Sequence, residues 1–245
     1  MNRFRLGILQ VNHDKSVALG DRFPDDSHRF RDLFDRLDNR YTYQVYMTIG
    51  GEVPKDIDEQ DGYLLTGSPL SVLDDLDFLA PLYDFIRHCD SAKKPLLGAC
   101  FGHQAIAVAL GGKVERPPSG LNMAVQTTTY SVYKGWMMPM QPLDLYVSHE
   151  DQVTMLPDGC EVLGGTDSCP IASFSKGRHL FTTQAHPEFN DGFMRAVFHE
   201  YGKHMSQNDY DRSLASLSLS TNGDVFARWA DQFFHQSKML ESGHV

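Results

Sequence analysis

The sequence has few of the features that mark membrane, disulfide-rich or nucleic-acid-binding proteins. No apolar run reaches the roughly 18 residues of a membrane-spanning helix. The four cysteines form no Cys-x-x-Cys pair, so zinc-type spacing is absent and a reduced chain is expected. Basic side chains are outnumbered 22 to 32 by acidic ones, and the net charge of −10 argues against a phosphate-backbone partner.

The N-terminal residues lead directly into an apolar segment and lack the apolar core of a signal peptide. Together with the reduced cysteines, this predicts a cytoplasmic protein that binds neither nucleic acid nor a membrane. The 245 residues are 41% hydrophobic, which is enough for the core of one α/β domain.

Along the chain, apolar runs alternate with segments of helical period, which predicts parallel strands joined by helices on both faces of a sheet. Strands are expected at residues 6–11, 41–49, 61–66 and 95–98, and helices at 29–37, 78–89 and 101–110. Further short strands are expected between residues 113 and 184, and a helix at 191–201. We expect residues 1–205 to form the main domain. Residues 206–245 would add a loop and a last helix, 224–234, packed on that domain.

A cysteine lies between a predicted strand and a predicted helix. Gly98 and Gly102 flank Cys100 at a spacing that lets two backbone segments approach closely. This layout is typical of a nucleophile elbow, and a thiol at a helix N-terminus is favoured as the thiolate. The alternative from this segment alone is a buried structural cysteine.

A second segment, Gln184-Ala185-His186-Pro187-Glu188, contains a base and an acid two residues apart. A cysteine nucleophile needs a base to take its proton, and the base needs a group that orients it. In an extended segment His186 and Glu188 project to the same side, so the carboxylate can fix the imidazole tautomer. Taken alone, the segment favours a surface turn, and the cysteine segment is what makes the catalytic interpretation the better one.

Together the two segments resemble the class I glutamine amidotransferase family, in which a Cys-His-Glu triad hydrolyses the side-chain amide of glutamine. Tyr63–Pro69 resembles the strand and oxyanion loop of that family, and Val147–Val153 resembles its Ser-His-x-Asp segment. The motifs occur in the family's order. The overall pattern is similar to stand-alone members, often labelled GMP-synthase-like, and to the plant γ-glutamyl peptidases.

The resemblance implies a flavodoxin-like three-layer sandwich with a mostly parallel sheet, a nucleophile elbow and a small antiparallel region. It implies the catalytic residues Cys100, His186 and Glu188, and an oxyanion hole from the backbone N–H groups of Ser68 and Phe101. The residues that it implies for substrate binding are Gly67, Gln104, Ser148, His149 and Asp151. Neither a metal ion nor an organic cofactor is expected.

Three functions remain open on the sequence. The first is a self-sufficient hydrolase that cleaves a γ-glutamyl amide, either glutamine or a γ-glutamyl amine or peptide, through a thioester on Cys100. The second is a glutaminase subunit that delivers ammonia to a separate synthetase partner. The third is a non-catalytic binding protein on the same scaffold, which the intact triad disfavours.

Overall fold

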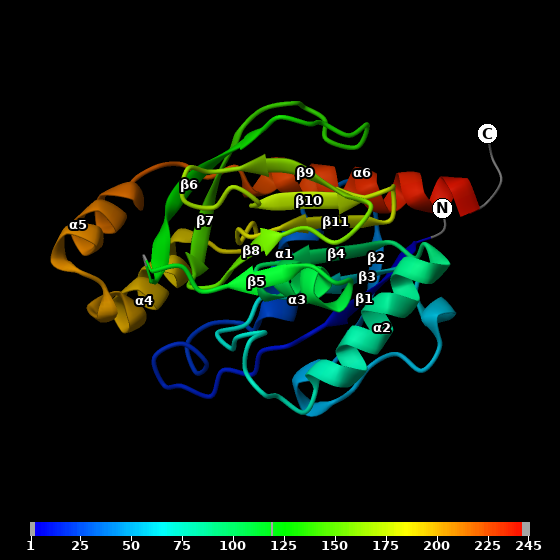
Figure 1. Ribbon diagram of the computed structural model, residues 1–245, viewed down its shortest axis with the longest axis horizontal. Helices are drawn as coiled ribbons and strands as arrows, with labels where there is room; N and C mark the ends of the chain where they lie inside the picture. Colours follow the sequence, from blue (N-terminus) through cyan, green and yellow to red (C-terminus); the bar gives the residue numbers. More distant parts are fainter. Residues whose placement is uncertain (1–2, 119, 242–245) are drawn as a thin grey trace.

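The computed structural model describes residues 3–118 and 120–241 and shows an α/β fold built on a nine-stranded sheet (Figure 1). The strands are β1 (Phe4–Leu9), β2 (Tyr41–Tyr46), β3 (Gly62–Leu65), β4 (Leu96–Ala99), β5 (Lys113–Glu115), β6 (Asn122–Tyr130), β7 (Leu143–His149), β8 (Gln152–Met155), β9 (Cys160–Gly165), β10 (Ser173–Lys176) and β11 (Leu180–Thr183). The α-helices are α1 (Asp26–Phe34), α2 (Leu79–Ala92), α3 (Phe101–Ala109), α4 (Asp191–Tyr201), α5 (Gln207–Ser216) and α6 (Gly223–Glu241). Short 3-10 helices cover Thr48–Gly50, Ile57–Glu59 and Gly202–His204.

The order of the main sheet is β2-β1-β3-β4-β11-β10-β9-β6-β7. In this order, neighbouring strands pair in parallel from β2 to β11. The pairs from β11 to β7 are antiparallel. The predicted parallel sheet is therefore confirmed for the half that contains β4 and β11, whereas the sheet as a whole is mixed. β5 and β8 form a separate antiparallel pair.

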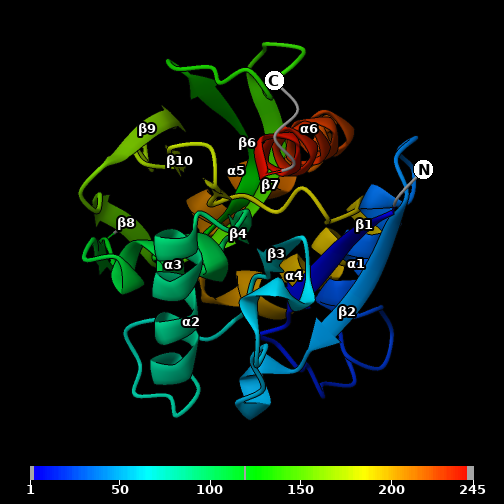
Figure 2. The same ribbon diagram turned by 90° about the vertical axis from the view of Figure 1, so that its right-hand side faces the viewer.

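Helices cover both faces of the parallel half, as Figure 2 shows with α2 and α3 on one side and α1 and α6 on the other. Strands β3, β4 and β11 are buried along their whole length, which is expected for parallel strands covered on two faces. Two hydrophobic clusters result, one centred on α1 and α6 and the other on α2 and α3.

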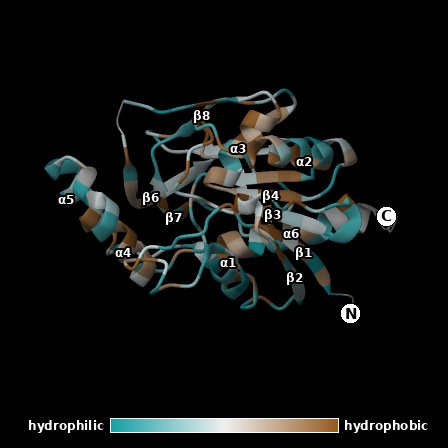
Figure 3. Cartoon of the chain, turned by 90° about the horizontal axis from the view of Figure 1, so that it is seen from below, coloured by the Kyte–Doolittle hydropathy of each residue, from teal (hydrophilic) through white to brown (hydrophobic). Residues whose placement is uncertain are grey.

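The segment 206–222 differs from its predicted loop, because it contains α5. Ser206 caps this helix by accepting a hydrogen bond from the amide of Asp209. Within α5 only Ser213 is buried, so the sequence carries no apolar period from which a helix could be predicted. Figure 3 shows α5 at the end of the molecule that lies away from both chain termini.

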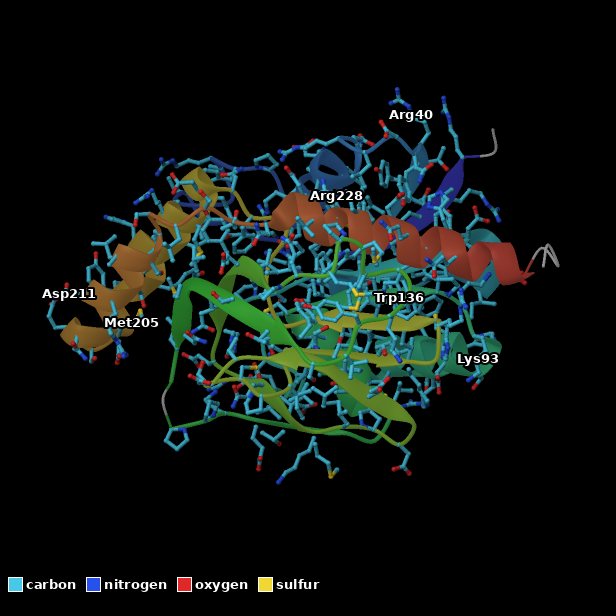
Figure 4. All side chains as sticks on the ribbon, turned by 90° about the horizontal axis from the view of Figure 1, so that it is seen from above. Arg40, Lys93, Trp136, Met205, Asp211 and Arg228 are labelled. Atoms are coloured by element: carbon cyan, nitrogen blue, oxygen red, sulfur yellow. The ribbon has the colours of Figure 1, made fainter. Side chains whose placement is uncertain are left out.

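Helix α6 is longer than the predicted 224–234 and packs its aromatic side chains on the sheet. Trp229 and Phe233 are fully buried, and the indole of Trp229 donates a hydrogen bond to the carbonyl of Pro139 (3.0 Å). Trp136 lies beside this helix in Figure 4, with its ring 5.4 Å from that of Phe233. Among the described residues, no helix is both long and apolar enough to cross a membrane.

Candidate active site

Cys100 lies at the junction between β4 and α3 with an unusual backbone conformation, φ 47° and ψ −103°. Close packing imposes this turn. A Cβ on Gly98 would lie 2.7 Å from the backbone of Gly102, and a Cβ on Gly102 would lie 2.3 Å from the carbonyl oxygen of Leu65. Only glycine at both positions allows these close backbone approaches. The chain can therefore form a sharp strand-to-helix turn with the thiol at its apex.

His186 and Glu188 follow β11, the strand beside β4, so the sheet brings them to Cys100. The amide of His186 donates to the carbonyl of Tyr146 (2.8 Å), and its Nδ1 lies 2.8 Å from Oε1 of Glu188. The Glu188 side chain is fully buried. The ring of Phe189 stacks on that of His186, with centroids 4.0 Å apart and planes at 16°. The imidazole is therefore fixed at its backbone, at Nδ1 and on one ring face.

Electrostatics at His186 favour the charged imidazolium. Burial by itself lowers the pKa of this histidine, but the negative charges of Cys100 and Glu188 outweigh burial and raise the pKa well above its ordinary value. Cys100 is also close to β7, with Sγ 3.7 Å from the carbonyl oxygen of Ser148. A thiolate and an imidazolium side by side are the form in which a cysteine acts as a nucleophile.

A cleft of about 270 Å³ opens at Cys100. Four of the five residues predicted to bind substrate line it, namely Gln104, Ser148, His149 and Asp151. Gly67 is the fifth, and it lies against His186 instead.

Gln104 is held by Asp151, whose carbonyl accepts a hydrogen bond from Nε2 of Gln104 at 2.7 Å. The same carbonyl lies 3.0 Å from Nδ1 of His149. His149 is nearly buried, and its pKa is lowered to about 4, chiefly by burial. It is therefore neutral near pH 7, and the positive charge of His186 also contributes to lowering its pKa.

Arg116 and Ser71 also line the cleft, and sequence reasoning missed both. The Nε of Arg116 donates to Asp151 (2.8 Å) and lies 3.4 Å from Glu150, while the Ser71 hydroxyl donates to Asp151. Arg116 belongs to no motif and follows a three-residue strand, so nothing in the sequence marked it. Arg116 becomes apparent once the walls of the cleft are known, because the carboxylates of Glu150 and Asp151 need a cation to balance their charge.

The loop after β3 lies against His186 and Cys100. A Cβ on Gly67 would lie 2.8 Å from Cε1 of His186, so only glycine leaves the ring in place. Among the described residues other than glycine, only Lys93 and Cys100 have positive φ, so Ser68 is not strained. Within the described part of the chain, the backbone N–H groups of Ser68 and Phe101 have no protein acceptor.

Comparisons with known proteins agree on one family. Glutamine amidotransferase class-I is the family whose sequence model matches the chain, over residues 38–201. "Gamma-glutamyl peptidase 3" of Arabidopsis thaliana is 32% identical over 157 residues, which are 60% of this chain and 63% of that protein. "GMP synthase [glutamine-hydrolyzing]" of Mannheimia succiniciproducens is 36% identical over 136 residues, covering 52% of this chain and 25% of that protein.

A solved structure of similar fold is the glutamine amido transferase from Methylobacillus flagellatus, with a TM-score of 0.72 and 18% identity over 98% of this chain and 95% of that one. The chain belongs to the class I glutamine amidotransferase family, and the predicted resemblance is confirmed. The names of these two relatives, a γ-glutamyl peptidase and a glutamine-hydrolysing synthase, agree with the predicted class of enzyme, and the chain spans less than two thirds of the length of either one. The described residues contain no group of His, Cys, Asp and Glu that could hold a metal ion.

Proposed function

We propose that this chain hydrolyses a γ-glutamyl amide bond through a γ-glutamyl thioester on Cys100. The observation that carries the proposal is the placement of Cys100, at positive φ between β4 and α3, beside an imidazole fixed by Glu188. This placement supports a nucleophile elbow at Cys100. The order β2-β1-β3-β4-β11 of the parallel strands supports a flavodoxin-like sheet with the site at its carboxyl edge.

In this mechanism the Cys100 thiolate attacks the carbonyl carbon, and the C–N bond breaks as His186 gives its proton to the departing amine. Water then hydrolyses the thioester, with His186 as the base. Glu188 holds the imidazole and stabilises its charged form. The unpaired N–H groups of Ser68 and Phe101 are suited to stabilise the oxyanion, and losing one such donor typically costs about 10²–10³ in rate.

The charges of the cleft support recognition of a free α-amino acid head. Among the described residues that line it, Arg116 is the one cation, and Glu150 and Asp151 are the acids. Arg116 can bind the α-carboxylate of the glutamyl group, and the acids can bind its α-ammonium, so that no charge is left unpaired. Gln104, Ser148 and His149 supply polar groups for the same head.

Substrates with one charge deleted test this assignment. We expect Arg116→Gln to raise KM for γ-glutamyl anilide by about tenfold, since a charged hydrogen bond contributes about 1.5–3 kcal/mol and Arg116 is half exposed. For 4-aminobutyryl anilide, which lacks the carboxylate, the same variant should leave KM unchanged. An equal change for both substrates would contradict the role of Arg116.

The experiment that tests the function itself is release of amine or ammonia by the purified chain. The panel contains glutamine, γ-glutamyl amides and γ-glutamyl peptides, with Cys100→Ala as the blank. Cleavage that depends on Cys100 supports the hydrolase, whereas cleavage that persists in Cys100→Ala refutes the mechanism.

A second candidate is a glutaminase that supplies ammonia to a separate synthetase. The similarity to a GMP synthase favours this candidate. The matched residues are 25% of that synthase, so the match leaves out most of that relative. Negligible turnover by the isolated chain, while Cys100 still reacts with a thiol-directed glutamine analogue, would favour this alternative over the self-sufficient hydrolase.

A further inference from the structure

The two sides of the site open into different cavities. Cys100 and Gln104 line the cleft of about 270 Å³, whereas His186 lines a second cavity of about 80 Å³, here called the inner cavity. The two cavities share four wall residues, Ser68, Pro69, Ser148 and Tyr201. A substrate whose carbonyl carbon lies at Cys100 would therefore extend into both cavities.

The chemistry of the proposed hydrolase decides which part of the substrate enters each cavity. The departing nitrogen takes its proton from His186, so it must lie within hydrogen-bond reach of that ring. His186 lines the inner cavity and not the cleft. The departing amine therefore occupies the inner cavity, and the glutamyl head occupies the cleft that contains Arg116.

The inner cavity continues into a larger space between α4 and the loop that follows β1. This outer cavity has a volume of about 300 Å³ and shares five wall residues with the inner one, namely Asn12, Asp14, Leu19, Arg29 and Phe193. Figure 1 shows the loop, in dark blue, at the end of the molecule where α4 lies. Phe23 of the loop packs edge-on against Phe193 of α4, with ring centroids 5.3 Å apart. A departing group longer than a few atoms can extend along this path.

The guanidinium of Arg29, which is buried and ion-paired, belongs to the wall of the inner cavity. Arg29 is 6% exposed, its guanidinium lies 3.8 Å over the ring of Phe193, and its two terminal nitrogens donate to Asp26 and to the carbonyl of Pro24. Its Nε finds no acceptor in the described part of the chain. Because Asp26 already balances its charge, Arg29 offers no free positive charge to an anion in this cavity.

Asp14 adds a negative charge to the walls of both cavities, and no basic side chain among the described residues forms an ion pair with it. Its Oδ1 accepts the amide of Ser16 (2.7 Å), and its charge, after burial, helps to raise the pKa of Tyr201. Asp14 lines both the inner and the outer cavity. A carboxylate placed beside the departing nitrogen would meet this like charge.

We infer that the inner cavity is a subsite for the departing amine, and that it selects amines with a neutral amide carbonyl next to the scissile nitrogen. Such amines are aminoacyl amides and peptides, which bring no negative charge to the wall that contains Asp14. A free amino acid carries a carboxylate at that position and is disfavoured by Asp14. This inference rests on the proposed γ-glutamyl hydrolase.

The test compares γ-glutamyl-alanine amide with γ-glutamyl-alanine, which differ only in that carboxyl group. We expect kcat/KM of the wild-type chain to favour the amide by about tenfold or more. Asp14→Asn should reduce this ratio several-fold. Asp21→Asn is the matched control, because it removes the same charge from the same loop at a residue that lines neither cavity.

Salt gives a second measurement that needs no variant. Since Asp14 is only half buried, the preference of the wild-type chain should fall as ionic strength rises. Equal kcat/KM for the two substrates, or an unchanged ratio in a folded Asp14→Asn, would overturn the subsite and leave the hydrolase standing. A failure to cleave either compound, or any other γ-glutamyl amide, through Cys100 would overturn the proposed function as well.

Discussion

Replacing Gly67 with alanine is expected to disable the site while leaving the protein folded. The added Cβ would lie 2.8 Å from Cε1 of His186 and 3.6 Å from Cβ of Cys100. The ring has little freedom to move, because Glu188 holds its Nδ1 at 2.8 Å and Phe189 stacks on its face. To reach an ordinary contact of 3.4 Å, the ring or the loop must shift by 0.6 Å (3.4 − 2.8).

A misplacement of about 1 Å can cost about 10²-fold in rate, so we expect kcat/KM of Gly67→Ala to fall by about 10–100-fold. That range corresponds to about 1.4–2.7 kcal/mol of transition-state stabilisation. The assay is steady-state hydrolysis of γ-glutamyl anilide, together with the rate at which iodoacetamide alkylates Cys100 and the thermal midpoint. Gly50→Ala is the control, because a Cβ there meets nothing within 4 Å.

The result that would refute this reasoning is a folded Gly67→Ala with kcat/KM within twofold of the wild-type value. Either the ring or the loop after β3 would then move without cost, or His186 would not be the group that transfers the proton. An equal loss of activity in Gly50→Ala would show that the effect is not specific to the site.

Three further predictions follow from the same contacts. Cys100→Gly should be about 1 kcal/mol more stable to urea than Cys100→Ala, because only glycine adopts positive φ without strain, and a reversed order would argue against strain there. Glu188→Gln should lower kcat by about 10²–10⁴ and move the alkaline limb of the pH–rate profile to lower pH, because the pKa of His186 falls when the carboxylate charge is lost; an unmoved limb would contradict that coupling. His149 is buried and its pKa is lowered from 6.5 to about 4, so its contribution to stability is fully present above pH 6.5 and is lost as the pH falls toward 4, by about 1 kcal/mol per pH unit. Urea unfolding at pH 7 and pH 5 should show this slope, which should be shallower in His149→Asn.

The parallel half of the fold could be predicted because each strand is an apolar run and each helix has an apolar stripe. The boundaries were less exact. The strand expected at 41–49 ends at Tyr46, since Thr48–Gly50 turn into a 3-10 helix, and the helix expected from residue 29 begins at Asp26, because Asp25 caps it. Both errors come from local capping and turn chemistry, which hydrophobic periodicity does not contain.

The antiparallel half was harder to predict. β5 has three residues, β8 has four, and the two strands are far apart in the sequence. No local sequence pattern therefore predicts that they pair with each other, or that they lie outside the main sheet. Helix α5 buries only Ser213, so its sequence is largely polar and contains no apolar stripe. Tertiary contacts decide the structure of such segments.

For the site, the residues that belong to motifs could be named from the sequence, and the contacts between motifs could not. Ser71 and Asp151 are 80 residues apart and meet only because the loop after β3 faces the end of β7. Arg116 and Asp14 lie on irregular segments with no spacing to a catalytic residue. Their relevance is visible only when the walls of the cavities are known.

The geometry of the site is therefore a property of the sheet more than of any one motif. Register pairs Leu65 with Gly98 and Ala99 with Thr183, so three neighbouring strands end at the same level and deliver the loop, the cysteine and the histidine to one point. The amide of Cys100 donates to the carbonyl of Thr183 at 2.8 Å, so the strained residue is tied to the strand that leads to His186. A shift of register by one residue would reverse the facing of these strands and separate the triad. The strain at Cys100 can persist because the strands on both sides of β4 fix its position.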